Sequence, residues 1–225
     1  MRFNTQMAEQ LIHNHAIMFD PDRGWALNTH KRYPRAPRSP FYIDLRAPLR
    51  SRPRFRRNTA RYMEQLIEES GVFFHCISDA PQAVTPLVVA LSDMTDVPMI
   101  SPRLAAKGHG LGNEIDGFYE VGQSVIVIDD LRTSGRTLEE IIALYRRNGL
   151  MVSACLTLID RAANEDNPRI GDVPYITGFR WSELLYFCRD RQVVTHELYD
   201  RCIRYPAELR AYVDAHEPIH AASSV

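Results

Sequence analysis

The sequence has almost no net charge, no long apolar run, little lysine and few cysteines. It contains 27 lysines and arginines against 28 aspartates and glutamates, a formal net charge of −1. A chain so nearly neutral lacks the strong positive field that attracts nucleic acid or an acidic membrane. No apolar stretch approaches the roughly 20 residues of a membrane span, and residues 1–19 lack the apolar core of a signal peptide. We therefore expect neither a nucleic-acid partner nor a membrane partner.

The few cysteines and lysines limit the kinds of site that the protein can contain. The four cysteines are Cys76, Cys155, Cys188 and Cys202. They have no metal-ligand spacing, so we expect buried thiols in a reducing cytoplasm rather than a zinc site or a disulfide framework. Lysine occurs only as Lys31 and Lys107. Where arginine is the usual cation, a retained lysine suggests that a compact ammonium group is needed at that position.

One stretch, residues 125–137, carries the strongest signal in the chain. Four apolar residues end in the adjacent carboxylates Asp129 and Asp130, and a Thr-Ser-Gly-Arg-Thr run follows at 133–137. This order predicts a buried parallel strand, a tight loop and a helix start. The backbone N–H groups at a helix N-terminus suit a phosphate. Neighbouring side chains on a strand point to opposite faces. The two carboxylates therefore cannot both lie in the core, where an unpaired carboxylate is costly. We expect a ligand with a phosphate and vicinal hydroxyls, a ribose 5-phosphate.

Two other interpretations explain less of this stretch. An ordinary strand-to-helix turn capped by Thr133 or Ser134 would explain the hydroxyls but not the carboxylate pair beside them. A P-loop would require Gly-x-x-x-x-Gly-Lys followed by serine or threonine. No such string occurs in the sequence.

Apolar patterns elsewhere predict alternating strands and helices. The expected strands are 41–45, 72–77, 97–100, 124–129, 152–159 and 175–179. The expected helices are 1–20, 57–70, 82–95, 137–148, 182–189, 195–204 and 206–215. This alternation implies an α/β fold with a central parallel sheet and right-handed crossovers. Because no repeat or linker interrupts the chain, we expect a single domain over residues 1–225.

A polar, glycine-rich passage at 103–122 interrupts the alternation. It contains Arg103, Lys107 and His109 among closely spaced glycines. A loop this long in a compact domain is usually functional or disordered. Placed beside the two aspartates, it could close over an anion and neutralise charge on a departing pyrophosphate. The alternative is a solvated surface loop whose charges are incidental.

The first resemblance to a known family comes from these two segments. Residues 125–137 resemble the motif with which type I phosphoribosyltransferases bind PRPP, 5-phosphoribosyl 1-diphosphate. Residues 103–110 are similar to the catalytic loop of orotate phosphoribosyltransferases, Arg-Lys-x-x-Lys-x-His-Gly, with Leu104 in place of the first lysine. The two motifs together indicate a phosphoribosyltransferase that acts on orotate.

Three further segments agree, in family order. Residues 39–46 resemble the Ser-Pro-x-Tyr-x-Asp-x-Arg segment near the orotate pocket, and residues 179–185 resemble the C-terminal strand-to-helix join. Residues 158–161 resemble the Leu-Asp-Arg whose arginine faces the orotate carboxylate. For Arg161 itself, an alternative is a strand-end arginine that pairs with Asp160 or Glu165. Ordered matches at sensible spacing are more specific than any one of them.

The resemblance implies a fold, a reaction and partners. The fold is type I phosphoribosyltransferase-like, a mostly parallel sheet flanked by helices, with residues 1–50 and the C-terminal helices forming a small hood and the periphery. The reaction is that of a glycosyltransferase, which moves a pentosyl group from PRPP to orotate to give orotidine 5′-monophosphate and pyrophosphate in pyrimidine nucleotide biosynthesis. Mg²⁺ would travel with PRPP. The protein would be a cytoplasmic homodimer with shared active sites, in which Lys107 reaches the neighbouring subunit.

The resemblance also implies the residues of the site. The PRPP contacts are Arg103, Lys107, His109, Asp129, Asp130, Thr133, Ser134, Gly135, Arg136 and Thr137. The orotate contacts are Phe41, Tyr42, Thr133 and Arg161. The Mg²⁺ on PRPP would lie near Asp79, Asp129 and Asp130. In catalysis, Asp129 and Asp130 would stabilise positive charge on the sugar ring. Lys107 and His109 would stabilise the leaving group, and His109 could also donate a proton.

Three anion-contact positions depart from the family pattern. Residues 78–83 lack the glycines of the family's pyrophosphate loop, and Asp79 there would repel a diphosphate unless Mg²⁺ lay between them. Leu104 replaces a lysine. The candidates for a lysine that the family has upstream are Asn28, Lys31 and Arg38. These departures keep two alternatives open, a phosphoribosyltransferase for another base and a non-catalytic regulator of the same fold that binds PRPP or a nucleotide.

Overall fold

The computed structural model describes residues 3–103, 113–162 and 166–216. Its contacts divide the chain into two compact units. The sheet unit contains residues 1–16 and 44–184, and the second unit contains residues 17–43 and 185–225. No helix among the described residues is long and apolar enough to span a membrane.

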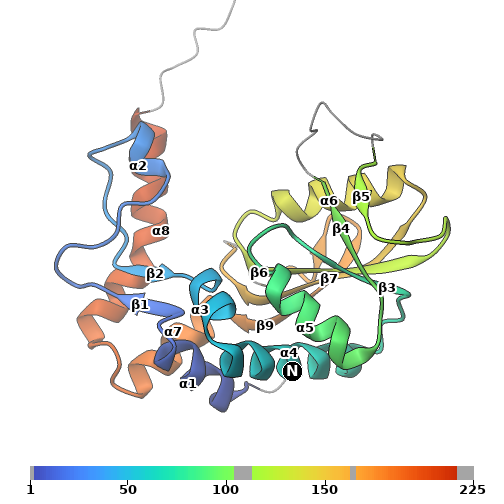
Figure 1. Ribbon diagram of the computed structural model, residues 1–225. Coiled ribbons are helices and arrows are strands. Elements are labelled where there is room, and N and C mark those ends of the chain that lie inside the picture. Colours follow the sequence, from blue (N-terminus) through green and yellow to red (C-terminus); the bar gives the residue numbers. More distant parts are fainter. Residues whose placement is uncertain (1–2, 104–112, 163–165, 217–225) are drawn as a thin grey trace, which may run out of the picture. The chain divides into compact units, whose positions relative to one another are not determined.

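The sheet unit is built on seven strands in the order β5-β4-β3-β6-β7-β9-β8 within the described residues (Figure 1). The strands are β3 (Cys76–Asp79), β4 (Met99–Pro102), β5 (Ile115–Asp116), β6 (Ser124–Arg132), β7 (Met151–Asp160), β8 (Arg169–Ile170) and β9 (Val173–Arg180). All neighbouring pairs from β4 to β9 are parallel. The edge strands β5 and β8 pair antiparallel. The predicted fold class, a mostly parallel sheet flanked by helices, is confirmed.

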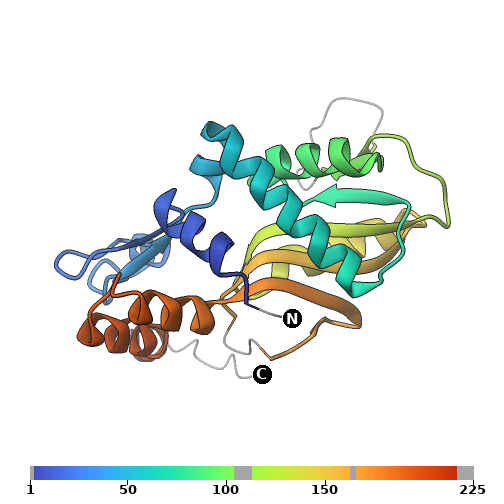
Figure 2. The same ribbon diagram turned by 90° about the horizontal axis from the view of Figure 1, so that it is seen from below.

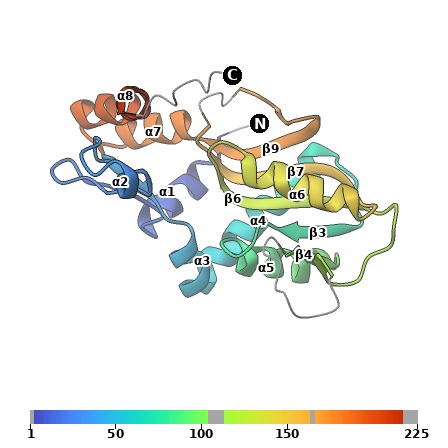
Figure 3. The same ribbon diagram turned by 90° about the horizontal axis from the view of Figure 1, so that it is seen from above.

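Helices cover both faces of this sheet. The helices of the unit are α1 (Thr5–His13), α3 (Arg46–Ser51), α4 (Pro53–Ser70), α5 (Thr85–Thr95), α6 (Arg136–Arg147) and the start of α7 (Trp181–Asp190). Figures 2 and 3 show α4 and α5 on one face and α6 on the other. Val125 and Val127 of β6 pack in one cluster with Ile141 and Tyr145 of α6. Because both faces are covered, β6 is a continuous apolar run rather than an alternating one.

The connections of the sheet reverse direction at its centre. The chain leaves β3 through α5 to reach β4 on one side, and leaves β6 through α6 to reach β7 on the other. Strand order therefore reverses between β3 and β6. Open α/β sheets bind their ligands at such a point, outside the carboxyl ends of the strands.

The second unit contains a small sheet and a long helix. Strands β1 (Ile17–Phe19) and β2 (Phe41–Ile43) pair antiparallel, and the helices are α2 (Thr29–Arg32) and α8 (His196–His216). Phe41 packs edge-on against Tyr205 of α8 with ring centroids 6.0 Å apart. Burial of such aromatic side chains supplies much of the packing energy of so small a unit.

Several sequence-based boundaries were wrong, among them the strand expected at 72–77, which runs from Cys76 to Asp79. The first helix ends at His13 because His15 adopts a φ of 56°, and residues 17–19 form β1 instead. The two helices expected around Pro206 are one helix, α8, with Pro206 inside it. Burial of Cys202 and Tyr205, which both precede Pro206, anchors the helix and offsets the hydrogen bond that proline cannot make. Strand β6 extends three residues beyond the expected end at Asp129.

Candidate functional site

The acid pair lies at the point where strand order reverses. Asp129 and Asp130 are the sixth and seventh of the nine residues of β6 and are partly exposed. The neighbouring strand β3 is in register up to the pairing of Asp79 with Ile128, and the Ala80 N–H donates to the Ile128 carbonyl at 2.8 Å. On the other side, Asp129 stands opposite Thr157 of β7. The two carboxylates are therefore at the position where this fold class binds ligands.

The electrostatics of the pair favour a ligand. Burial, and next the charge of Asp130, raise the pKa of Asp129 to about 8. Burial also raises the pKa of Asp130, while the positive charge of Arg46 on α3 opposes both shifts. The Asp130 N–H donates to Asp129 Oδ1 at 2.8 Å. Two carboxylates that resist being charged together attract a cation or hydroxyl donors.

The donor set decides what kind of cation fits. Among the described residues, no group of three histidine, cysteine or acidic side chains is placed to hold a metal ion. Two oxygen-donor side chains suit Mg²⁺ that brings water and substrate phosphates as its other ligands. The acid pair fits a cation delivered with a substrate rather than one held by the protein alone.

The loop that follows β6 leads directly into α6. Gly135 precedes the helix with a φ of 84°, a conformation that favours glycine, and its carbonyl accepts from the Glu139 N–H at 3.0 Å. Thr133, Ser134 and Thr137 are exposed. Arg136 is exposed too and forms an i,i+4 ion pair with Glu140. The first N–H groups of α6 and three hydroxyls thus lie beside the acid pair, an arrangement suited to a phosphate.

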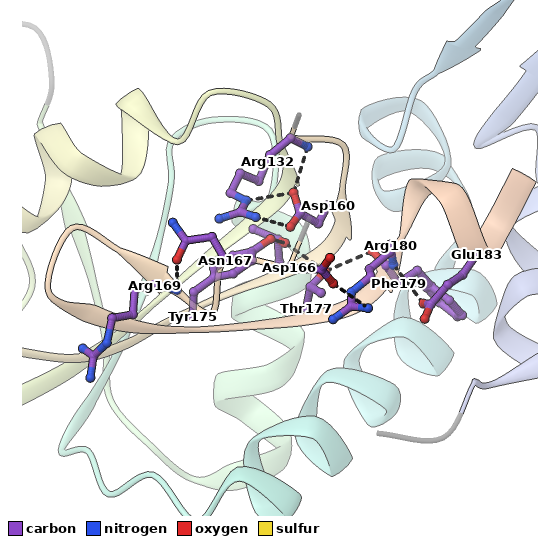
Figure 4. A network of polar contacts seen from close by, with 12 residues as sticks. Arg132, Asp160, Asp166, Asn167, Arg169, Tyr175, Thr177, Phe179, Arg180 and Glu183 are labelled. Carbon is purple, nitrogen blue, oxygen red and sulfur yellow. Dashed lines mark hydrogen bonds and ion pairs between the residues drawn. The ribbon is translucent and has the colours of Figure 1, made fainter. Parts of the chain in front are cut away.

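A buried ion pair stands next to this loop (Figure 4). Arg132 Nε donates to Asp160 Oδ1 at 2.8 Å, and Arg132 Nη2 contacts Asp160 Oδ2. The two side chains are 4% and 0% exposed. The Arg132 guanidinium also lies 4.0 Å from the ring centroid of Tyr175, and Asp160 Oδ1 accepts from the Ala162 N–H at 2.9 Å. The opposite charges of this pair are matched, and the guanidinium fork fits the two carboxylate oxygens.

Arg132 was not among the residues predicted for the site. The signal that identifies it is the βαβ connection, because β6, α6 and β7 follow one another and place Arg132 opposite Asp160 in register. The N–H of Arg161 donates to the Arg132 carbonyl at 2.8 Å. Since Asp160 is held by Arg132, the alternative in which Asp160 pairs with Arg161 gains no support. Glu165 lies outside the described residues.

The loop after β3 differs from what its sequence suggested. Asp79 is 1% exposed, and its carboxylate accepts from Ser101 Oγ at 2.6 Å and from the Thr85 hydroxyl. These contacts tie β3 to β4 and to the start of α5. Asp79 is therefore a buried structural acid, and the expectation that it faces Mg²⁺ or a diphosphate conflicts with this geometry. Arg50 Nη2 donates to the Gln82 carbonyl of the same loop at 2.8 Å.

The other predicted residues are dispersed. Arg103 follows β4 and pairs with Asp116 of β5, with Nε 2.8 Å from Oδ2. Lys107 and His109, like Leu104, lie outside the described residues. Phe41 and Tyr42 belong to the second unit, where Phe41 is buried and Tyr42 is 38% exposed and stacks on Trp25. The three candidates for the family's upstream lysine also belong to the second unit, and all are exposed: Asn28, Lys31 and Arg38.

A cavity of about 710 Å³ lies elsewhere on the sheet unit. It is lined by α1 and by the start of α4, including Glu9, His13 and Arg54. None of the predicted site residues that the structure describes lines it. The arrangement of the carboxyl ends of β6 and β7, not this cavity, marks the candidate site.

Comparison with known proteins agrees with this arrangement. No family model matches the chain. An orotate phosphoribosyltransferase of Listeria innocua is 30% identical over 206 residues, which are 88% of this chain and 92% of that protein. One from Caenorhabditis elegans is 35% identical over 123 residues, 55% of this chain and 54% of that protein.

A solved structure extends the likeness to three dimensions. The UMP synthase of Leishmania donovani superposes on this chain with a TM-score of 0.71 at 27% identity. The superposed region covers 93% of this chain and 42% of the UMP synthase chain. The chain thus spans about half the length of the nematode relative and less than half of the UMP synthase. It matches the bacterial relative over nearly the whole of both sequences. The chain belongs to the orotate phosphoribosyltransferase family.

Proposed function

We propose that the protein transfers the 5-phosphoribosyl group of PRPP to orotate, producing orotidine 5′-monophosphate and pyrophosphate for pyrimidine nucleotide synthesis. One observation carries the proposal. In a member of this family, a partly exposed acid pair, Asp129 and Asp130, adjoins the N-terminus of α6 where the strand order reverses. A sugar phosphate has the two groups, vicinal hydroxyls and a phosphate, that such a site binds.

The residues of β6 and its loop divide the work on the sugar. Thr133, Ser134, Gly135, Arg136 and Thr137 would bind the 5-phosphate through backbone N–H groups, hydroxyls and the helix N-terminus. Asp129 and Asp130 would accept hydrogen bonds from the ribose hydroxyls. As the bond from C1 to the diphosphate oxygen breaks and a bond to the base nitrogen forms, their negative charge would stabilise the positive charge that develops on the ring.

Mg²⁺ fits this site as a companion of PRPP. When bound, it would neutralise charge on the diphosphate. Asp129 and Asp130 would hold it through their oxygens or through its water ligands, which relieves the repulsion between the two carboxylates. Asp79, whose oxygens face Ser101 and Thr85, takes no part in this proposal.

The base and the leaving group would contact other segments. Arg161 would bind the orotate carboxylate through two N–H groups, with Thr133 and the exposed Tyr42 as further contacts. Arg103, Lys107 and His109 would stabilise the departing pyrophosphate. Phe41 would support Tyr42 from the core of the second unit.

We further propose that the chain acts as a homodimer in the cytoplasm, with Lys107 reaching the partner's site. All four cysteines are buried and free, which supports a reducing compartment. The single domain over residues 1–225, with residues 1–50 and the C-terminal helices as hood and periphery, belongs to the same proposal.

An ultraviolet assay of orotate consumption with PRPP and Mg²⁺ tests the reaction. Orotate should be consumed only when both PRPP and Mg²⁺ are present, with one pyrophosphate released per orotate. Turnover of adenine, guanine or uracil but not of orotate would replace the proposal with another base specificity. PRPP binding by calorimetry without any turnover would replace it with a non-catalytic regulator.

A further inference from the structure

We propose that the Arg132–Asp160 pair is a positioning device that fixes the phosphate loop, residues 133–137, relative to Arg161. The inference rests on the proposed function, because it assigns the two ends of the pair to two different substrates. The loop after β6 would bind the sugar phosphate, and Arg161 after β7 would bind the carboxylate of the base. The pair would keep these two binding elements at the spacing that the reaction requires.

The pair links the ends of two adjacent strands through three contacts, and a fourth contact fixes the turn that follows β7. Arg132 and Asp160 are opposite each other in register, and their side chains form the buried fork. The Arg161 N–H donates to the Arg132 carbonyl at 2.8 Å, and the Ala162 N–H donates to Asp160 Oδ1 at 2.9 Å. The end of β6 therefore holds the backbone that leaves β7, and Asp160 fixes the turn of that same backbone. A shift of the segment after β7 would break contacts to both strands.

The same arginine also lies against the phosphate loop. A side chain at Gly135 would place its Cβ 3.9 Å from Arg132 Cδ and 3.3 Å from Ile170 Cδ1. The stem of Arg132 thus lies close to Gly135, the residue that precedes α6. Because this residue sets the direction of the helix N-terminus, displacement of the Arg132 stem would move the N–H groups that face the phosphate.

The network continues toward the acid pair. The Arg132 guanidinium lies over Tyr175, whose hydroxyl hydrogen-bonds the Thr157 hydroxyl. Thr157 stands directly opposite Asp129 on the neighbouring strand. The chain of contacts from Arg161 through Arg132 and Tyr175 therefore ends beside the carboxylates. Figure 4 shows Arg132, Asp160, Tyr175 and Thr177 gathered in this part of the sheet unit.

Stability alone does not require charges at this position. A buried ion pair is often replaced by well-packed apolar residues with no loss of stability, because the attraction between the charges is largely cancelled by their desolvation. A fork of two N–H groups on a carboxylate, in contrast, fixes both distance and angle between two strands. This geometric constraint is what apolar side chains cannot supply.

The test separates positioning from stability by replacing the whole pair. In the double variant Arg132→Met/Asp160→Leu, the melting temperature should change by less than about 5 °C. The KM for orotate should rise, and kcat should fall, by about 10- to 100-fold, as expected for misplacement of binding groups by an ångström or less. A double variant that melts like the wild type and keeps wild-type kinetics would overturn the proposal.

A conservative variant covers the case in which the double variant does not fold. Arg132→Lys keeps the charge but loses the fork, so we expect near-normal melting with a KM for orotate raised by about threefold to tenfold. Unchanged kinetics in this folded variant would also overturn the proposal. The matched control is Arg146→Met/Asp172→Leu, which removes an exposed fork of the same type and should leave the kinetics unchanged.

A second readout keeps the inference separate from the proposed reaction. If the wild-type protein does not consume orotate, the reaction is refuted, but PRPP binding can still be measured by calorimetry with Mg²⁺. Hydrogen exchange at the amides of residues 133–137 and 161–162 can be followed as well. The double variant should bind PRPP about tenfold more weakly and exchange these amides faster. Binding and exchange equal to the wild type would refute the positioning role.

Discussion

Carboxylates lie at the ends of two neighbouring strands of one sheet, and their surroundings are opposite. Asp160 of β7 is fully buried, paired with Arg132 and hydrogen-bonded by the Ala162 N–H. Asp129 and Asp130 of β6 are partly exposed and adjacent to each other, and burial raises the pKa of both. The first site is complete within the protein, whereas we propose that the second is completed by a bound substrate.

The difference indicates how this sheet divides structure from function. A satisfied carboxylate resists change, because removing any partner leaves a buried charge without compensation. In a carboxylate pair, the two negative charges repel each other, and a bound cation or hydroxyl donor relieves this repulsion. The two kinds of site are one strand apart, so the rigid one can hold the loops that surround the reactive one.

Breaking the complete site should have the largest effect on stability. Asp160→Ala removes one partner of the buried pair and leaves the Arg132 guanidinium without its carboxylate. We expect a loss of about 3–5 kcal/mol in the free energy of unfolding, measured by urea denaturation followed by circular dichroism.

The matched control for this variant is Asp172→Ala. It removes the partner of Arg146 in a fork that is 46% and 75% exposed, where the effect of an ion pair is small. If Asp160→Ala were no more destabilising than Asp172→Ala, the contrast between a complete and an incomplete site would be lost.

Removing a charge from the incomplete site should act on catalysis instead. Asp130→Asn keeps the shape of the side chain but removes the negative charge that we propose stabilises the sugar ring. We expect kcat/KM to fall by about 10²- to 10³-fold, with folding and the circular dichroism spectrum unchanged. Steady-state kinetics of orotate consumption measure the loss. Wild-type kinetics in Asp130→Asn would remove the acid pair from the mechanism.

Much of this contrast was predictable from local sequence. The apolar run before Asp129, the adjacent acids and the Thr-Ser-Gly loop identified the strand, the helix start and the candidate site, because each depends on neighbouring residues only. The alternation of strands and helices predicted a mostly parallel sheet for the same reason. These features needed no knowledge of which segments meet in space.

The rest depends on pairings between distant residues. Arg132 becomes significant only when β7 brings Asp160 beside it, and Asp79 becomes structural only when Ser101 and Thr85 meet it. From the sequence, an acid in a loop near an anion predicts repulsion, because the hydroxyls that satisfy it come from other elements. The continuity of α8 through Pro206 likewise depends on the burial of Cys202 and Tyr205.

The smallest expected effect concerns the stability of the unliganded protein. Asp129→Asn removes a carboxylate whose pKa in the folded protein is about 8 because of burial and the charge of Asp130. Near pH 3 the carboxyl is protonated in the folded state and largely so in the unfolded state, so wild type and variant should melt alike. As pH rises toward 8, the unfolded wild-type chain releases this proton while the folded chain keeps it, and wild-type stability falls. The variant should therefore be more stable than the wild type by at least about 1 kcal/mol at pH 8, measured by melting both proteins without substrate or Mg²⁺ across this pH range. Asp172→Asn should show the opposite trend, because hydrogen bonds from Arg146 hold the pKa of Asp172 below its usual value and its contribution is lost as pH falls.

Equal melting of wild type and Asp129→Asn at pH 8 would mean that the acid pair is as well satisfied as Asp160, and the distinction between the two strand ends would fail.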